Sequence, residues 1–166
     1  MKQNLIVMGI APCLEGDLEQ LFRLAGPDAF DFMAVGLDCA ERYLGRIEHA
    51  VSYHPDEFGA FRKRREAAGG NLDYRTHAHK HAQGVDHIWP YEAPSGSSAM
   101  LGVEAGLGLG YGRIVVAGVP LDTRYHGYRG GWDRRIEKLR DRVRGMSGYP
   151  RELLGEPTAE WLNGKG

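Results

Sequence analysis

Residues 94 to 122 read PSGSSAMLGVEAGLGLGYGRIVVAGVPLD, and this stretch predicts a turn, a helix and a buried strand in succession. Ser97 stands where a helix N-cap belongs, and Gly110 or Gly112 stands where the helix ends. The β-branched run RIVVAGV that follows is typical of a strand covered on both faces. A Ser/Gly turn that opens a helix directs backbone N–H groups and hydroxyls at one place, which favours an anion, most often a phosphate.

Within the expected helix, Ser98, Gly102 and Gly106 recur every four residues and form a face of small side chains. Glycine inside a helix costs stability, so its presence needs a reason. Close packing on the sheet, on a partner helix or on a ligand would each supply one, and we favour packing.

Strands and helices alternate along the whole chain, which favours a parallel sheet. We therefore expect an α/β fold: a single Rossmann-like domain over residues 1–166, with a mostly parallel sheet and helices on both faces. The expected strands lie at 4–9, 32–36, 47–53, 74–81 and 113–119, with an extended piece at 85–91. The expected helices lie at 18–24, 55–68, 98–109, 132–143 and 158–162, and residues 127–131 are expected to be flexible.

The composition narrows the class of protein. The chain has 166 residues, a formal net charge of −1 and two cysteines, Cys13 and Cys39, that are far apart in sequence. No disulfide framework, signal peptide or membrane-spanning run is evident, so we expect a soluble cytoplasmic protein. The near-neutral charge gives no nucleic-acid signature, and the composition permits a homo-oligomer.

Several strong motifs are missing from the sequence. GxxxxGK[ST] does not occur, GxGxxG does not follow the first strand, and no DxD, GxSxG or HExxH is found. These absences argue against a P-loop enzyme, a nicotinamide enzyme and a glycosyltransferase of the usual metal-dependent kind.

Candidate chemistry gathers in the loops that leave the expected strands. In open α/β sheets, ligands bind beyond the carboxyl ends of the strands. These loops hold Cys13, Asp38, Cys39, His54, Asp122, Tyr125, His126 and Tyr128, together with the Ser/Gly turn. We take His126 as a candidate general base, with Asp122 beside it, and Tyr125 as a candidate stacking residue.

The run THAHKH places His77, His79 and His81 on one face if it forms a strand. Three imidazoles on one face can bind zinc. We favour a polar strand face or a subunit contact, and we expect no resident metal.

The blocks quoted above resemble a known superfamily of Rossmann-like proteins. It includes bacterial lipo-oligosaccharide sialyltransferases, archaeal 6-hydroxymethylpterin pyrophosphokinase and its relatives, the flagellin-modifying Maf proteins, and short phage and prophage proteins with the same blocks. Their first loop reads G-x-G-P-S-L, where this chain has GIAPCL. Their second block has a (T/S)-S-G turn and then L-G-Y-(K/R)-x-I-x-L-x-G-x-D, where this chain has SGSSAMLGVEAGLGLGYGRIVVAGVPLD.

The resemblance implies a nucleotide or nucleotide-sugar as the ligand, a phosphorylated small molecule in either case, and no further cofactor is indicated. By position, the residues implied to hold it are Gly9, Pro12, Cys13, Asp38, Ser95, Gly96, Ser97 and Ser98. Cys13 replaces the usual serine and Ala11 the usual second glycine, so the sialic acid specificity of the family is not carried over.

Three functions are open at this point. The first is a transferase with a nucleotide-activated donor and no metal, in which Arg124 or Arg129 offsets phosphate charge and His126 acts as base. The second is a pyrophosphokinase-like enzyme that needs magnesium, with Asp122 and Asp38 as ligands. The third is a nucleotide-binding or scaffold protein without catalysis.

Overall fold

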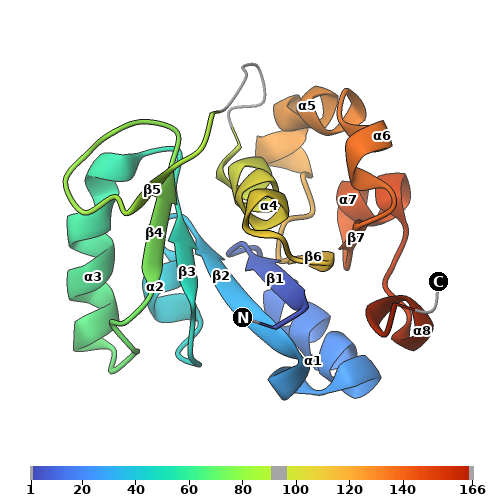
Figure 1. Ribbon diagram of the computed structural model, residues 1–166, viewed down its shortest axis with the longest axis horizontal. Helices are drawn as coiled ribbons and strands as arrows, with labels where there is room; N and C mark the ends of the chain where they lie inside the picture. The colour runs from blue at the N-terminus through green and yellow to red at the C-terminus, as the bar shows by residue number, and fades with distance from the viewer. Residues whose placement is uncertain (1, 91–96, 165–166) are drawn as a thin grey trace.

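The computed structural model describes residues 2–90 and 97–164 of the chain. Its strands form one parallel sheet in the order β5-β4-β3-β2-β1-β6-β7, with helices on both faces (Figure 1). The α/β, Rossmann-like architecture expected from the sequence is confirmed. The strands are β1 (Asn4–Met8), β2 (Phe30–Val35), β3 (His49–Val51), β4 (Arg75–Ala78), β5 (His87–Ile88), β6 (Arg113–Ala117) and β7 (Val143–Gly145).

Two hydrophobic clusters, one on each face of the sheet, join the helices to the strands. The first cluster takes in α1 (Leu14–Ala25), α2 (Cys39–Arg42), α3 (Phe58–Ala67) and α8 (Ala159–Leu162). The second takes in α4 (Ser98–Leu109), α5 (Arg129–Asp133), α6 (Ile136–Leu139) and α7 (Gly148–Leu154). Short 3₁₀ helices lie at η1 (Pro27–Ala29), η2 (Pro55–Glu57) and η3 (Thr123–Tyr128). Within the described ranges, no helix combines the length and the apolar character needed to cross a membrane.

The central strand β1 contributes to both clusters. Ile6 and Met8 belong to the first cluster, while Leu5 and Val7 belong to the second, and all four side chains are fully buried. Since successive residues of a strand face opposite sides, a continuous apolar run is what a sheet covered on both faces requires.

Helix α4 begins and ends where the sequence predicts. The Ser97 side chain accepts a hydrogen bond from the Met100 N–H, and Gly110 ends the helix with φ 92°. A Cβ added at Gly106 would lie 2.6 Å from the Leu5 side chain, and one at Gly102 would lie 3.1 Å from Val7. The small-residue face is therefore a packing face on the sheet.

Three expected elements differ in the structure. The helix expected over 132–143 is wrong: the segment holds the end of α5, the separate helix α6 and the start of strand β7. Its amphipathic pattern arises because Trp132 and Leu139 both enter the second cluster from two short helices. Residues 127–131, expected to be flexible, are helical, and α1 begins at Leu14 rather than at residue 18.

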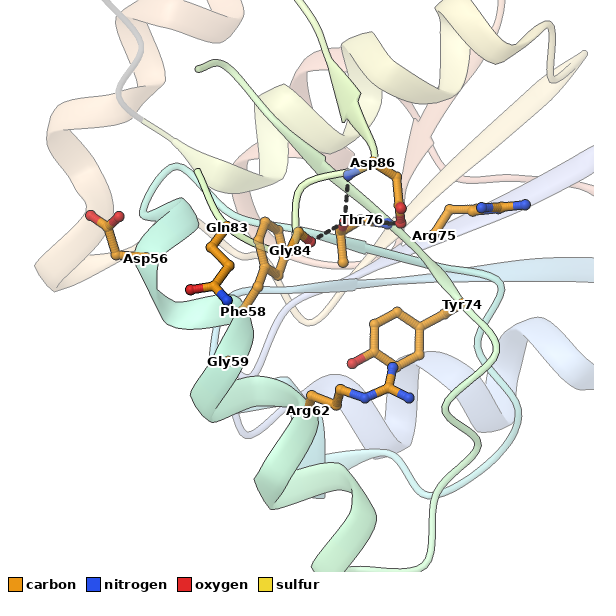
Figure 2. A pocket seen from close by; sticks show the side chains of 10 residues that line it. All are labelled: Asp56, Phe58, Gly59, Arg62, Tyr74, Arg75, Thr76, Gln83, Gly84 and Asp86. Carbon is orange, nitrogen blue, oxygen red and sulfur yellow. Dashed lines mark hydrogen bonds between the residues drawn. The ribbon is translucent and has the colours of Figure 1, made fainter. Parts of the chain in front are cut away.

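The connection between β4 and β5 is unusually short. It spans only residues 79–86 and contains no helix, whereas a parallel crossover ordinarily needs a dozen residues or more, usually a helix. Asp86 accepts hydrogen bonds from the N–H and the hydroxyl of Thr76, which ties the loop to β4. A groove of about 570 Å³ remains between this loop, β4 and α3 (Figure 2).

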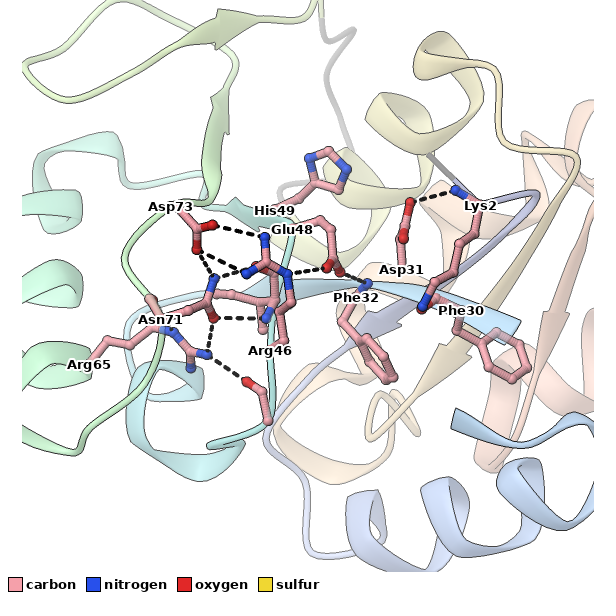
Figure 3. A network of polar contacts seen from close by, with 12 residues as sticks. Lys2, Phe30, Asp31, Phe32, Arg46, Glu48, His49, Arg65, Asn71 and Asp73 are labelled. Atoms are coloured by element: carbon pink, nitrogen blue, oxygen red, sulfur yellow. Dashed lines mark hydrogen bonds and ion pairs between the residues drawn. The ribbon is translucent and has the colours of Figure 1, made fainter. Parts of the chain in front are cut away.

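A network of polar side chains joins the segments that precede or begin β2, β3 and β4 to one another (Figure 3). The Arg65 side chain is fully buried, and its guanidinium donates to the carbonyls of Ala40, Tyr43, Gly45 and Asn71 and to the Asn71 side chain. These bonds run to neutral oxygens, so burial lowers the pKa of Arg65. The residue holds two loops on the α3 face together.

A chain of buried hydrogen bonds crosses the α4 face of the sheet. The Trp89 indole N–H donates to Nδ1 of His77 at 3.0 Å, and Nε2 of His77 lies 2.9 Å from Nδ1 of His49. Nε2 of His49 lies 2.8 Å from the Tyr111 hydroxyl, which donates to the Asp31 carboxylate at 2.8 Å. Because an indole N–H can only donate, both histidines must be neutral with the proton on Nε2.

Candidate functional site

The strand order defines one position where ligands are expected. From β1 the chain builds the sheet outward to β2, β3, β4 and β5, and then returns through α4 to place β6 on the other side of β1. The carboxyl ends of β1 and β6 therefore form the topological switch point, which is where open α/β sheets bind their ligands.

The loops after β1 and β6 press directly against each other. The Ala11 N–H donates to the Gly118 carbonyl at 3.1 Å. A Cβ on Gly9 would lie 2.4 Å from the Gly118 carbonyl oxygen, which is closer than real Cβ atoms come. The family resemblance implies that Gly9 holds a nucleotide. In this structure the close contact between the two loops is itself a reason for glycine, because a side chain at this position would collide with Gly118.

The first turn of α1 carries acidic side chains. Asp17 is 3% exposed, and it accepts hydrogen bonds from the Gly118 N–H at 2.8 Å and from the Ser147 hydroxyl. The half-buried Cys13 adjoins Asp17, and burial together with that charge raises the pKa of the Cys13 thiol. Glu15 adds a second acidic group to the same turn. An anionic ligand is therefore disfavoured at α1, and Cys13 is a neutral thiol.

The start of α4 differs from that of α1. No acidic residue stands in its described first turn. The hydroxyl oxygen of Ser98 accepts a hydrogen bond from the Tyr53 N–H at 2.9 Å, which joins this turn to the carboxyl end of β3. Helix dipole and N–H groups together favour an anion at such an end. Ser97 and Ser98 lie here as predicted, whereas Ser95 and Gly96 fall outside the described residues.

An aromatic group lies next to Ser98, and one member, Tyr53, is not among the candidate residues named from the sequence. The rings of Tyr53 and His79 stack with centroids 4.1 Å apart, and His54 meets Tyr53 edge-on at 6.2 Å. Burial, Lys80 and His54 all lower the pKa of His79. Its Nδ1 atom is buried and has no hydrogen-bond partner among residues 2–90 and 97–164. The sequence signal for this group is the Tyr-His-Pro run at residues 53–55, which places two rings at the end of an expected strand.

The loop after β6 is strained and firmly held. Leu121 and Thr123 have positive φ angles of 53° and 31°, which non-glycine residues seldom adopt, and Asp122 stands between them. The Arg129 side chain donates to the Leu121 carbonyl at 2.8 Å, and the Tyr149 N–H donates to the Pro120 carbonyl at 2.9 Å. Strain of this kind persists only where surrounding contacts impose it, and it clusters at functional sites.

The remaining predicted residues of this loop lie in η3. Asp122 and His126 are both exposed, as the sequence-based roles require. The ring of Tyr125 stacks on that of Tyr128 with centroids 6.1 Å apart, and the Arg124 guanidinium lies 5.5 Å from the Tyr125 ring centroid. The loop thus presents two aromatic rings, a cation, an imidazole and a carboxylate to solvent.

Two other predicted groups have structural partners. Asp38 follows β2 and forms an ion pair with Arg64 of α3 at 3.0 Å. His77 uses both ring nitrogens in the buried chain, so the three-histidine metal face does not form. In the part of the chain that the structure describes, no group of three or more His, Cys, Asp or Glu side chains is arranged to hold a metal ion. Pro12, also implied by the resemblance, is exposed next to Cys13.

Comparisons with known proteins bear on the fold. No known protein family matches the chain, and no curated protein sequence matches it. A solved structure of the sialyltransferase CstII from Campylobacter jejuni, in complex with the substrate analogue cytidine-5'-monophosphate, is similar with a TM-score of 0.61. The match has 10% sequence identity and covers 96% of this chain and 87% of that chain. The resemblance to sialyltransferases is thereby confirmed at the level of the fold.

Proposed function

We propose that this protein binds a nucleotide or nucleotide-sugar at the carboxyl edge of the sheet, with its phosphate at the first turn of α4. We further propose that it is a metal-independent, glycosyltransferase-like transferase. The similar structure of a sialyltransferase with cytidine-5'-monophosphate supports this choice of ligand class.

The contrast between α1 and α4 carries the proposal. Both helices have 12 residues and begin after a strand at the same edge of the sheet. Helix α1 carries two carboxylates in its first turn, those of Glu15 and Asp17, whereas the first turn of α4 holds serine hydroxyls and no carboxylate. A phosphate gains from the helix dipole at α4 and meets like charge at α1.

The neighbouring rings suit the rest of a nucleotide. Tyr53 is joined to Ser98 through its backbone, so its ring and the stacked His79 ring lie next to the proposed phosphate position. Aromatic faces of this kind stack on bases and sugars. Tyr53, His54 and His79 are therefore proposed as base or ribose contacts.

The loop after β6 is proposed to supply the transfer chemistry. The imidazole of His126 takes the proton of an acceptor hydroxyl as that oxygen bonds to the anomeric carbon of the donor. The bond from that carbon to the nucleotide phosphate breaks, and the phosphate leaves with the electron pair. Arg124 offsets the charge that develops on the leaving phosphate, and Asp122 orients the imidazolium.

The alternatives predict different ligand requirements. A pyrophosphokinase-like enzyme would need magnesium, yet Asp38, one of its two carboxylates, is paired with Arg64. A scaffold protein would bind a nucleotide without turnover.

One pair of variants tests where the phosphate binds. Ser98→Asp keeps an acceptor for the Tyr53 N–H and is favourable at a helix start, but it places a negative charge at the proposed phosphate position. Ser98→Asn keeps the acceptor without the charge. Cytidine and uridine nucleotides, with and without magnesium, should raise the melting temperature of the wild type and of Ser98→Asn, without a magnesium requirement.

Ser98→Asp should remain folded and bind at least about tenfold more weakly, a loss of about 1.4 kcal/mol. Equal binding by Ser98→Asp, or no melting shift in the wild type at millimolar nucleotide, would show that the phosphate assignment is wrong.

A further inference from the structure

The groove beside β4 has a cause in the topology. The eight-residue crossover from β4 to β5 brings no helix onto the α3 side of these strands. A cavity of about 570 Å³ stays open there, with α3 along one side and the 79–86 loop along the other (Figure 2). This volume falls within the usual range of small-molecule sites. The groove lies on the opposite face of the sheet from α4, so it is separate from the nucleotide edge.

The charged side chains that face the groove are Arg62, Asp56 and Asp86. Arg75 borders the groove through β4, but it pairs with His49 and its side chain lies with that of His49 on the α4 face. Two carboxylates face one guanidinium, so an anionic ligand is disfavoured.

Much hydrogen-bonding capacity in the groove is unused. Among the described residues, the side chains of Asp56 and Gln83 have no hydrogen-bonded or ion-paired partner, and one Asp86 oxygen is also uncommitted. A carboxylate only accepts hydrogen bonds, whereas an amide both donates and accepts. A ligand that satisfies all of them must carry several groups able to donate and accept, which is the chemistry of hydroxyls.

The floor of the groove is aromatic. Phe58 and Tyr74 line it and are 4% and 8% exposed. Their rings offer an apolar surface beneath a polar rim, which suits a molecule that has C–H groups on one side and hydroxyls around its edge. We infer that this groove is a binding site for a neutral saccharide of one or two sugar units, on the face of the sheet away from α4.

Gly59 allows the site to be blocked cleanly. It lies on α3 at the groove, and a Cβ added there meets no described atom within 4 Å. The backbone therefore accepts a side chain at this position, and Gly59→Phe should place a ring in the groove, while Gly59→Ala leaves the groove open and serves as the matched control. Gln83→Ala removes a rim amide that has no partner among the described residues, and it gives a second test if Gly59→Phe fails to fold.

Saturation-transfer NMR on the full chain would measure binding of glucose, galactose, N-acetylglucosamine, lactose and maltose, with citrate and lysine as charged comparators. At least one sugar should bind the wild type and Gly59→Ala, and should bind Gly59→Phe at least about tenfold more weakly. Cytidine monophosphate should not displace it, which separates this result from the nucleotide proposal. Binding of no sugar, equal binding by Gly59→Phe, or binding of a charged comparator alone would overturn the inference.

Discussion

The buried chain from Trp89 to Asp31 predicts a steep loss of stability in mild acid. His49 is 9% exposed and His77 is fully buried. Burial lowers the pKa of His49 to about 4 and that of His77 to about 3, because a charged imidazole there loses its water. In the unfolded chain both would titrate near pH 6.5.

The sign and size of the effect follow from proton linkage. Below about pH 6.5 the unfolded chain binds two protons that the folded chain does not, so the free energy of unfolding falls as the pH falls. Stability is complete above the unfolded pKa and is lost progressively toward the folded values of about 4 and 3. Between pH 7.5 and 5.5, each histidine lowers the free energy of unfolding by about 1.35 kcal/mol, and the pair lowers it by roughly 2.7 kcal/mol.

Urea unfolding at pH 7.5, 6.5 and 5.5 would measure this loss in the wild type and in a His49→Gln, His77→Gln double variant. The variant should be less stable at pH 7.5, but its free energy of unfolding should fall by roughly 2.7 kcal/mol less on acidification. Proton NMR of the wild-type imidazoles gives an independent reading if the variant does not fold. Parallel pH profiles, or titration of either ring near pH 6.5 in the folded protein, would refute the neutral hydrogen-bonded chain.

Three further changes test other parts of the structure. Arg65→Met should cost at least about 3–5 kcal/mol in urea unfolding, because it leaves a cage of buried carbonyls unpaired, whereas the exposed neighbour Arg64→Met should cost under about 1 kcal/mol. Gly9→Ala should lower stability by about 1–3 kcal/mol through its clash with the β6 loop, while Gly16→Ala, which meets no described atom within 4 Å, should stabilise the helix. If the protein is a transferase, His126→Gln should reduce turnover by roughly 10²–10⁴-fold and leave nucleotide affinity nearly unchanged in a calorimetric titration; a large loss of affinity would contradict its role as base.

Local signals in the sequence predict the elements whose ends are set locally. The bounds of α4 follow from two of its own flanking residues. The Ser97 side chain caps the start of the helix, and the left-handed backbone of Gly110 ends it, without help from distant residues. β1 and β6 follow from apolar runs that only a sheet covered on both faces can bury.

Elements set by distant contacts are not predictable in this way. Val143 reads as the end of an amphipathic helix, yet it forms an edge strand because Ile114 of β6 pairs with it. The sequence favours a polar strand face or a subunit contact for His77, yet its side chain is fully buried, and Trp89 and His49 from other elements contact both its ring nitrogens. Pattern reasoning along the chain does not specify such partners.

The candidate site likewise has one part that local sequence predicts and another part that depends on distant contacts. Its position follows from the alternation of strands and helices, and the carboxyl edge does hold most of the residues named from the sequence. The burial of Asp17 in the first turn of α1 depends on Gly118 and Ser147, which donate hydrogen bonds to it and lie more than a hundred residues away in the sequence.

A crystal structure of the protein grown with cytidine monophosphate would test phosphate binding at α4 most directly. The phosphate should lie within hydrogen-bond distance of the backbone N–H groups of Ser98 and Ala99, with the nucleoside toward Tyr53 and His79. A nucleotide bound with its phosphate at the start of α1, or elsewhere on the molecule, would contradict the proposed site.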